Sequence, residues 1–358
     1  MKKEIGSEFW TGCSPVGKYG CKWNPPQGWS VKETLSGRVA LEYVVERLVE
    51  EGKTSVYMPS YCCHTMIEPF LKHGVRVAFY NILPAESGLK RVFDHDHGCD
   101  VVFLLDYFGF TDDETAKIAE IQHDRGKQII YDATHSVYSG FKYDVCDYVF
   151  GSYRKWMDVN IGFVAFKDET EMHFGDDWKQ LDAYIDIRTR LFDLKSRYMN
   201  DEDVDKKLFL TWINEAEEML EQEYHHTLPD QRSIDVLEHT DCTFLVQSRR
   251  DNAKVLMEGI ADLDDERVRS FVDVMSDHDT PLFVPIFVRT DLRDELRRCL
   301  IEHSIYCPVH WPLSELHVIS DAATEVFRGE LSLLCDQRYN HSDMNRIVET
   351  INNYLKKC

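Results

Sequence analysis

From residue 36 onward, short apolar runs alternate with amphipathic segments, and no other feature of the sequence limits the fold of this chain as much. Apolar residues recur at i, i+3, i+4, i+7 and i+8 over Leu41–Val49, which marks one face of a helix. The run Val101–Leu105 is apolar throughout, as is typical of a strand covered on both faces. Strands that alternate with helices predict an α/β fold, with a mostly parallel sheet and helices on both of its sides.

The same periodicities divide the rest of the chain into elements. In the first part, strands are expected at 56–58, 75–82, 128–131, 148–153 and 161–166, and helices at 65–73 and 113–124. The long polar stretch 170–226 has a helical pattern with a late apolar stripe. Beyond a break at Leu228–Pro229, we expect a helix over 231–261, strands at 282–288 and 305–309, and helices at 292–303 and 342–355, the last capped by Ser342.

The length of the chain and its two α/β patterns predict two domains. A chain of 358 residues is too long for one compact core. We expect a large domain at 36–229 and a smaller C-terminal α/β domain at 230–358. Residues 1–35 are rich in glycine, proline and tryptophan, which predicts an irregular N-terminal arm packed over its own or a neighbouring subunit.

Composition excludes several classes of function. The net charge of −22 disfavours nucleic acid as a partner, because phosphate contacts need a basic face. No apolar run reaches the roughly 20 residues that span a bilayer, and no apolar segment follows the N-terminal lysines, so we expect a cytoplasmic protein without membrane contact. The 11 cysteines are scattered and form no CxxC pair, which predicts reduced thiols and neither disulfides nor a zinc site.

Three residues at the start of the first amphipathic helix have the chemistry of an anion site. A helix N-terminus offers free N–H groups and the positive end of the helix dipole. Ser36 can donate its hydroxyl, Gly37 permits close approach, and Arg38 can pair with a phosphate. A plain serine cap beside a solvated arginine would give the same letters, so this motif alone does not decide between the two.

Two further groups stand at the ends of expected strands. Asp132, in IIYDATHS, could pair with a protonated pyridine nitrogen, and His135 could bond a ring oxygen or stack on a ring. Ser152 and Lys155, in GSYRKW, could place a hydroxyl on a phosphate and an amine on an aldehyde, with Arg154 as a nearby cation. The alternatives are a capping aspartate with a packed histidine, and two basic residues at the surface.

Three other polar segments contain residues that could bind a ligand or a metal ion. The segment Pro59–His64 opens a helix after a strand, so Tyr61 or His64 could face the same crevice, with Cys62 and Cys63 as small lining residues. The segment Asp94–Asp100 has the letters of a metal cluster, but aspartate and glycine at this density are typical of a polar loop. The pair His225–His226 lies at a helix end, where imidazole suits the dipole. We therefore assign no metal site.

Six segments, taken together and in order, resemble the DegT–DnrJ–StrS family of pyridoxal-phosphate (PLP)-dependent sugar aminotransferases. The similar segments are LSGRVALEYVVERL, MPSYCCHTMIEPFLKHGVRVAFYNI, VVFLLDYFGF with YDATHSVYSG, SRRDNAKVLMEGI, HSIYCPVHWPL and LSLLCDQRYNHSDMNRIVETI. They run from about residue 34 to the end. The resemblance implies the PLP-dependent transferase fold type I and a homodimer with active sites at the subunit interface.

The resemblance also implies roles by position. Lys155 would form the Schiff base with PLP, Asp132 would pair with the pyridine nitrogen, and His135 would touch the ring oxygen. The phosphate would be bound by Ser152 and the Gly37–Arg38 turn. The implied reaction moves an amino group from glutamate or glutamine to a nucleotide-linked keto-sugar, with the Lys155 amine as base and then acid.

The chain departs from the family pattern at several positions. The lysine follows the serine by three residues where five are usual, and Arg38 replaces a threonine. Asp106 stands where a histidine is common, and Cys63, which we include among the cofactor-binding residues, stands where an aromatic ring is often found. These departures leave two alternatives open: a PLP-dependent lyase or dehydratase on the same scaffold, or a non-catalytic binding protein derived from it.

Overall fold

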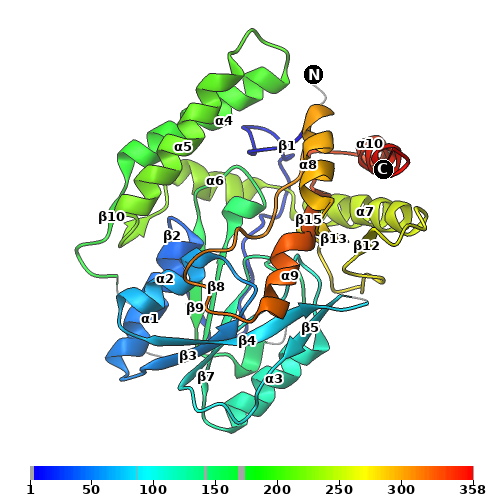
Figure 1. Cartoon of the computed structure of the whole chain (residues 1–358). Coiled ribbons are helices and arrows are strands. Elements are labelled where there is room, and N and C mark those ends of the chain that lie inside the picture. The colour runs from blue at the N-terminus through cyan, green and yellow to red at the C-terminus, as the bar shows by residue number, and fades with distance from the viewer. Residues whose placement is uncertain (1–3, 87, 141–142, 168–173, 358) are drawn as a thin grey trace.

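A large sheet organises the N-terminal part of the chain (Figure 1). In this computed structural model, which describes residues 4–86, 88–140, 143–167 and 174–357, the sheet has eight strands in the order β2-β9-β8-β7-β6-β3-β4-β5. Their bounds are β2 Ser30–Thr34, β3 Ser55–Pro59, β4 Arg76–Pro84, β5 Leu89–Val92, β6 Val101–Leu105, β7 Gln128–Asp132, β8 Tyr148–Ser152 and β9 Gly162–Phe166. The central strands β8, β7, β6, β3 and β4 pair in parallel, while β9, β2 and β5 pair antiparallel at the edges. The predicted mostly parallel sheet is confirmed.

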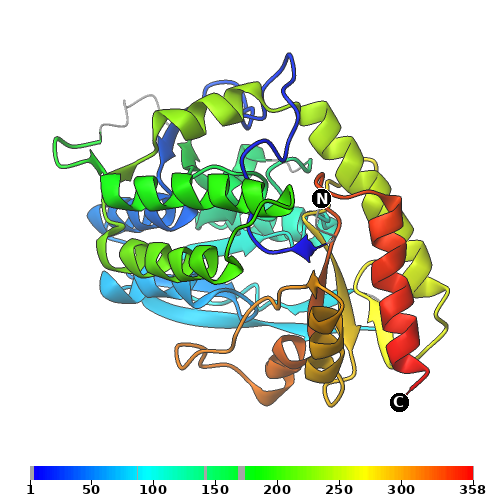
Figure 2. The same ribbon diagram turned by 90° about the horizontal axis from the view of Figure 1, so that it is seen from above.

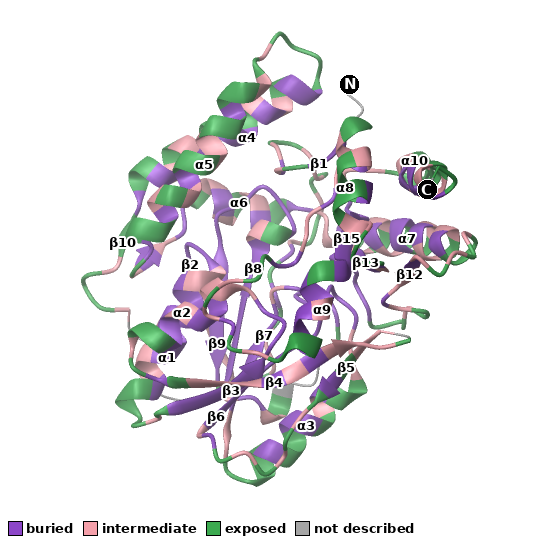
Figure 3. Cartoon of the chain, viewed as in Figure 1, coloured by how far each residue is buried: buried purple, intermediate pink, exposed green. Residues whose placement is uncertain are grey.

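Helices and loops cover both faces of this sheet. Every residue of β3, β6, β8 and β9 is buried (Figure 3). Helix α1 (Gly37–Glu50) packs on β8 and β9, α2 (His64–Lys72) on α1 and β4, and α3 (Asp113–Asp124) on β6 and β7. Two short 3₁₀ turns, η1 (Tyr143–Val145) and η2 (Tyr153–Lys155), flank β8. Because parallel strands end at the same sheet edge, these connections bring the residues after β7 and β8 together.

A helical hairpin follows the large sheet. It consists of α4 (Asp182–Met199) and α5 (Lys206–Glu223), and the short strands β10 (Lys179–Gln180) and β11 (Thr227–Leu228) pair at its base. Figure 1 shows the hairpin extending away from the large sheet. The expected apolar stripe is confirmed at Phe209, Ala216 and Leu220, which are buried.

The N-terminal arm lies over its own subunit. Strand β1 (Ile5–Gly6) pairs in parallel with β14 (Ile305–Tyr306), and Val16 bridges Thr240. The Trp23 ring stacks on Phe163 with 5.1 Å between centroids. The expectation of an irregular segment was wrong for residues 30–34, because their backbone completes the edge of the large sheet as β2.

The C-terminal part is a smaller α/β unit. Its three-stranded antiparallel sheet has the order β12-β13-β15. The elements are α6 Gln231–His239, α7 Cys242–Ala261, β12 Val268–Ser270, β13 Phe283–Val288, α8 Arg293–Glu302, β14 Ile305–Tyr306, α9 Asp321–Gly329, β15 Glu330–Leu334 and α10 His341–Leu355. Figures 1 and 2 both show α7 and α10 side by side, at the far end of the molecule from α1.

Several sequence-based expectations in this part need correction. The helix expected over 231–261 is broken, because the Asp241 side chain caps a new helix by accepting from the Phe244 N–H at 3.0 Å. The strand expected at 305–309 is only two residues long, since Pro308 has no N–H to pair. The cap of α10 is Asn340 and not Ser342, because Asn340 and Asp343 form a capping box.

The two largest apolar cores among the described residues surround the two main sheets. The first surrounds the large sheet and also contains Leu245 of α7 and Phe327 of α9. The second surrounds the small sheet and contains Leu256 of α7 together with Ile5 of the arm. The chain therefore passes from one core to the other within α7. No helix in the described ranges is long and apolar enough to cross a membrane.

Candidate active site

One cavity of about 290 Å³ is lined by all seven cofactor-binding residues expected from the sequence. They come from the α1 N-terminus, the loop before α2, the end of β7 and the end of β8. The seven residues are Gly37, Arg38, Cys63, Asp132, His135, Ser152 and Lys155. Residues up to 118 positions apart in the sequence, from Gly37 to Lys155, thus meet in one place.

The start of α1 forms one wall of the cavity. Ser36 is the N-cap, and its hydroxyl accepts from the Val39 N–H at 3.4 Å. A β-carbon on Gly37 would lie only 3.1 Å from the Ser152 β-carbon, so the absence of a side chain at 37 lets β8 approach the helix end. The free N–H groups of the helix start and the Ser152 hydroxyl therefore face one small volume, as an anion site requires.

Arg38 adds a cation to this wall. Its guanidinium lies 5.3 Å from the centroid of the Tyr224 ring, a cation–π contact that orients the side chain. Among the described residues, no carboxylate is within ion-pair distance of Arg38. The guanidinium is thus available to an anion bound at the helix start.

Asp132 ends β7 as a buried carboxylate without a cation. Its Oδ1 accepts from the Thr134 N–H at 2.8 Å, and within the described part of the chain no basic side chain pairs with it. Burial raises its pKa to about 6. A cationic group in the cavity would offset this desolvation, which is the role that a protonated pyridine nitrogen would have.

His135 is held as a neutral imidazole. Its Nδ1 accepts from the Phe108 N–H at 3.2 Å, so the ring proton is on Nε2. Burial, together with the Lys155 charge, lowers its pKa to about 3. The ring stacks on Trp311 with 5.3 Å between centroids and an angle of 24°. His135 can therefore donate one hydrogen bond, from Nε2.

Lys155 projects from the turn η2 and is exposed within the cavity. It has no hydrogen-bond partner in the described part of the chain. Its neighbour Arg154, by contrast, is held by Tyr184 at 2.9 Å and by Glu217 at 3.0 Å. An unpaired primary amine in a cavity that is also lined by Arg38 and by the buried Asp132 can react with a carbonyl group.

Cys63 lies at the start of α2 and lines the cavity. Burial opposes ionisation of this thiol, but hydrogen bonds from His64 and Thr65 lower its pKa. The Thr65 hydroxyl donates to Cys63 Sγ at 3.1 Å. Of the two residues expected to face the crevice, His64 lines the cavity, whereas Tyr61 is fully buried and packs against Tyr107.

Sequence reasoning missed one aromatic wall and one acidic partner of the site. Trp311 lines the cavity from the C-terminal part of the chain and stacks on His135. It lies in HSIYCPVHWPL, one of the segments that resemble the family, and this was the only sequence feature that pointed to it. Glu217 of α5 lines it as well and pairs with Arg154, whose charge lowers the Glu217 pKa. Asp106, a noted departure, lies outside the cavity and accepts from Thr115 at 2.7 Å.

A second cavity, of about 440 Å³, adjoins the first, because Arg154 and Lys155 line both. Its basic side chains outnumber its acidic ones, although the chain as a whole is acidic. The basic residues are Arg154, Lys155, Arg188, Lys206, Arg249, Arg297 and Arg338, and the acidic residues are Glu8 and Asp336. Such a chamber favours anionic molecules next to the Lys155 amine.

The Asp94–Asp100 segment uses its polar groups within the fold. Asp100 accepts from the Thr54 N–H at 2.8 Å and from the Ser55 hydroxyl at 2.9 Å. The His97 ring stacks on Tyr57 with 4.1 Å between centroids. These contacts are those of a loop tied to β3, as the composition predicted.

Comparison with known proteins relates the fold to one group of enzymes. No family model matches the sequence, and no curated protein is detectably similar to it. Three solved structures cover most of the chain. The aminotransferase TlmJ from Streptoalloteichus hindustanus is 16% identical, with 91% of this chain and 86% of that chain covered and a TM-score of 0.59. The Helicobacter pylori aminotransferase PseC, involved in the biosynthesis of pseudoaminic acid, is 13% identical, with 92% and 87% covered and a TM-score of 0.62. The putative sugar aminotransferase Spr1654 from Streptococcus pneumoniae, in its PLP form, is 15% identical, with 91% and 87% covered and a TM-score of 0.62. The chain has the fold of these proteins, which confirms the expected fold type I.

Proposed function

We propose that this protein is a PLP-dependent aminotransferase that moves an amino group from glutamate or glutamine to a keto-sugar, in nucleotide-linked form. The observation that carries the proposal is the convergence of the seven residues expected to bind the cofactor on one cavity, with the unpaired Lys155 amine inside it. Solved proteins of the same fold support it, since PseC is an aminotransferase involved in the biosynthesis of pseudoaminic acid, and the structure of DesI was analysed in the presence of its TDP-sugar product.

The residues present fit PLP on three counts. The α1 start and Ser152 form a compact anion site with Arg38 beside it. Asp132 is a buried carboxylate whose charge is destabilised by burial, and a protonated pyridine nitrogen would supply the cation that stabilises it. Lys155 is an unpaired amine within the same cavity. A protein that only binds a phosphate-bearing ligand would need the anion site but not Asp132 or Lys155, and this disfavours the non-catalytic alternative.

When bound, PLP supplies an electron sink for the electron pair left on the substrate carbon. Asp132, whose Oδ1 accepts from Thr134, would hold the proton on the ring nitrogen, and His135, whose Nδ1 accepts from Phe108, would donate from Nε2 to the ring oxygen. Lys155 Nζ would hold the cofactor at rest and would serve as the base and then the acid at the substrate carbon. Arg154 is held away from this exchange by Tyr184 and Glu217.

The cationic chamber next to Lys155 supports an acidic substrate. Arg338 pairs with Asp336 at 2.7 Å, and Arg188 pairs with Glu8 at 3.1 Å, which fixes their side chains in the wall. The chamber keeps an excess of positive charge, and this excess suits the carboxylates of glutamate and the phosphates of a nucleotide-sugar.

We also propose a homodimer, a division into an arm and two domains, and a cytoplasmic location. A homodimer and the division into an arm at 1–35, a PLP-binding domain at 36–229 and a small domain at 230–358 follow from the resemblance and the sequence pattern. A cytoplasmic location is supported by the free thiols of all ten described cysteines.

The test is a half-reaction. The purified protein is loaded with PLP and given glutamate or glutamine alone, and the absorbance of the cofactor is followed. Transamination converts the cofactor into its aminated form, with a shift of the visible band to shorter wavelength and release of the keto acid. No release of keto acid and no aminated cofactor with either donor would overturn the proposal.

A further inference from the structure

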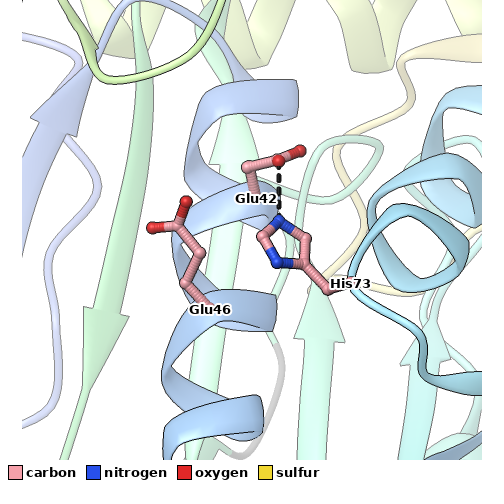
Figure 4. A group of neighbouring side chains, drawn as sticks. All are labelled: Glu42, Glu46 and His73. Atoms are coloured by element: carbon pink, nitrogen blue, oxygen red, sulfur yellow. Dashed lines mark hydrogen bonds and ion pairs between the residues drawn. The ribbon is translucent and has the colours of Figure 1, made fainter.

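Glu42, Glu46 and His73 form a cluster away from the PLP cavity (Figure 4). Glu42 and Glu46 lie one turn apart on α1, and His73 is the C-cap of α2. Their ligand atoms all lie within 4.8 Å of one another. None of the three lines the cavity around Lys155, so the proposed reaction does not account for them.

We infer that this cluster of Glu42, Glu46 and His73 is a zinc site, with His225 beside Glu42 at its edge. Zinc bonds to nitrogen and oxygen are about 2.0–2.2 Å long, which places neighbouring ligand atoms roughly 3.3 Å apart in a tetrahedron. Glu42 Oε1 lies 2.9 Å from His73 Nε2 and 3.3 Å from His225 Nδ1. One buried carboxylate oxygen thus has two imidazole nitrogens at the spacing of a zinc site. Glu46 adds a second carboxylate, with its ligand atom within 4.8 Å of those of Glu42 and His73.

The two carboxylates are oriented by a second layer of groups. Glu42 Oε2 accepts from the Tyr224 hydroxyl at 2.7 Å, and Lys72 donates to that hydroxyl at 3.0 Å. Glu46 is contacted at 3.1 Å by His226, which in turn bonds Asp177. Outer partners of this kind fix the direction of first-layer ligands in metal sites.

Burial and charge also favour a cation here. The Glu42 side chain is only 2% exposed, although it carries a carboxylate, while His225 is half exposed and leaves a path for the ion to enter. Two carboxylates balance the charge of a divalent ion, and the imidazole nitrogens favour zinc over calcium or magnesium.

The site would tie three separate segments together. It joins α1, the end of α2 and the chain after α5, and Tyr224 links it to Arg38 through the cation–π contact. Bound zinc would therefore brace the start of α1 and the α5 wall of the active site. Because zinc would bind the folded state, it would raise the melting temperature with concentration.

The experiment titrates the full chain, stripped with a chelator, with zinc chloride and with cobalt chloride. We expect one zinc ion per chain, a melting temperature that rises with zinc, and cobalt absorption bands without the strong near-ultraviolet band of thiolate ligands. His73→Ala and Glu46→Gln should each weaken zinc binding by at least roughly 100-fold, since even outer partners are worth 10–100-fold. Tyr224→Phe should weaken it by about tenfold.

The control is His341→Ala, which removes an exposed histidine at the start of α10 and should leave zinc binding unchanged. Glu46→Gln is nearly isosteric, so its near-ultraviolet circular dichroism should match that of the wild type and exclude misfolding. Three results would overturn the inference: no stoichiometric zinc binding, a thiolate band with cobalt, or wild-type affinity in both His73→Ala and Glu46→Gln.

Discussion

Gly162 packs its α-carbon directly against the backbone of Ser36. A β-carbon at position 162 would lie 2.2 Å from the Ser36 carbonyl carbon and 2.5 Å from the Gly37 nitrogen. Gly162 begins β9 and pairs with both Thr34 and Ser152, so it stands between the two elements that form the anion site. Gly162 thus sets the distance between α1 and the large sheet.

Gly162→Ala is expected to push the start of α1 away from Ser152. The clash is with backbone, which cannot rotate away, so stability should fall by about 1–3 kcal/mol. The affinity for PLP should fall at least about tenfold, because the phosphate contacts depend on this spacing. Denaturant unfolding and PLP titration measure the two effects.

The matched control for Gly162→Ala is Gly98→Ala. Gly98 is exposed, and a β-carbon there would meet no atom within 4 Å. This variant should unfold within about 0.5 kcal/mol of the wild type and bind PLP normally. Equal PLP affinities for the two variants would show that the Ser36–Gly162 contact does not shape the anion site.

Asp132→Asn is expected to lower transamination by at least about 100-fold, because an amide cannot hold the proton on the ring nitrogen through charge. PLP should still bind through the α1 start. Steady-state kinetics with glutamate and a keto acid measure the loss. An unchanged rate would remove Asp132 from the site.

Asp106→Asn is the matched control for Asp132→Asn. Both carboxylates are fully buried, and burial raises the pKa of each to about 6. Asp106, however, lies outside the cavity, and its hydroxyl partners are Thr115 and Tyr131. We expect a stability loss of about 1–3 kcal/mol and normal kinetics.

Glu330 predicts a pH dependence of stability. Burial raises its pKa from 4.5 to about 8, while the His310 N–H donates to it at 2.6 Å. Between these values the folded state holds a proton that the unfolded state releases, so this residue makes stability fall as pH rises, by at most about 1.4 kcal/mol per unit. Glu330→Gln should mimic the protonated form and gain stability relative to the wild type from pH 5 to pH 8. A constant difference across that range would contradict the raised pKa.

Much of the site could be predicted because it depends on local rules. Asp132 and Ser152 end adjacent parallel strands, and the Ser36 cap opens the first helix, so topology alone brings them to one sheet edge. Trp311 could not be placed in this way, since it reaches the cavity from the C-terminal part. The proposed zinc site was missed because its residues are far apart in the sequence: Glu42 and Glu46 lie on α1, and His73 ends α2.

The edges of the fold were also harder to predict than its centre. Strand β2 has the sequence SVKET, with only one buried residue, so it carries almost no apolar signal. Its identity depends on pairing with β9, more than 120 positions away, which no local pattern contains. In α10, both Asn340 and Ser342 are good caps, and the reciprocal bond from Asp343 selects Asn340.

The role of Lys155 is tested by reduction of the PLP-loaded protein with borohydride, followed by peptide mass mapping, in the wild type and in Lys155→Ala. We predict a long-wavelength band in the wild type, with the reduced cofactor fixed on Lys155. We predict no covalent attachment and no transamination in Lys155→Ala. Attachment to another lysine, or turnover at the wild-type rate in Lys155→Ala, would contradict the account.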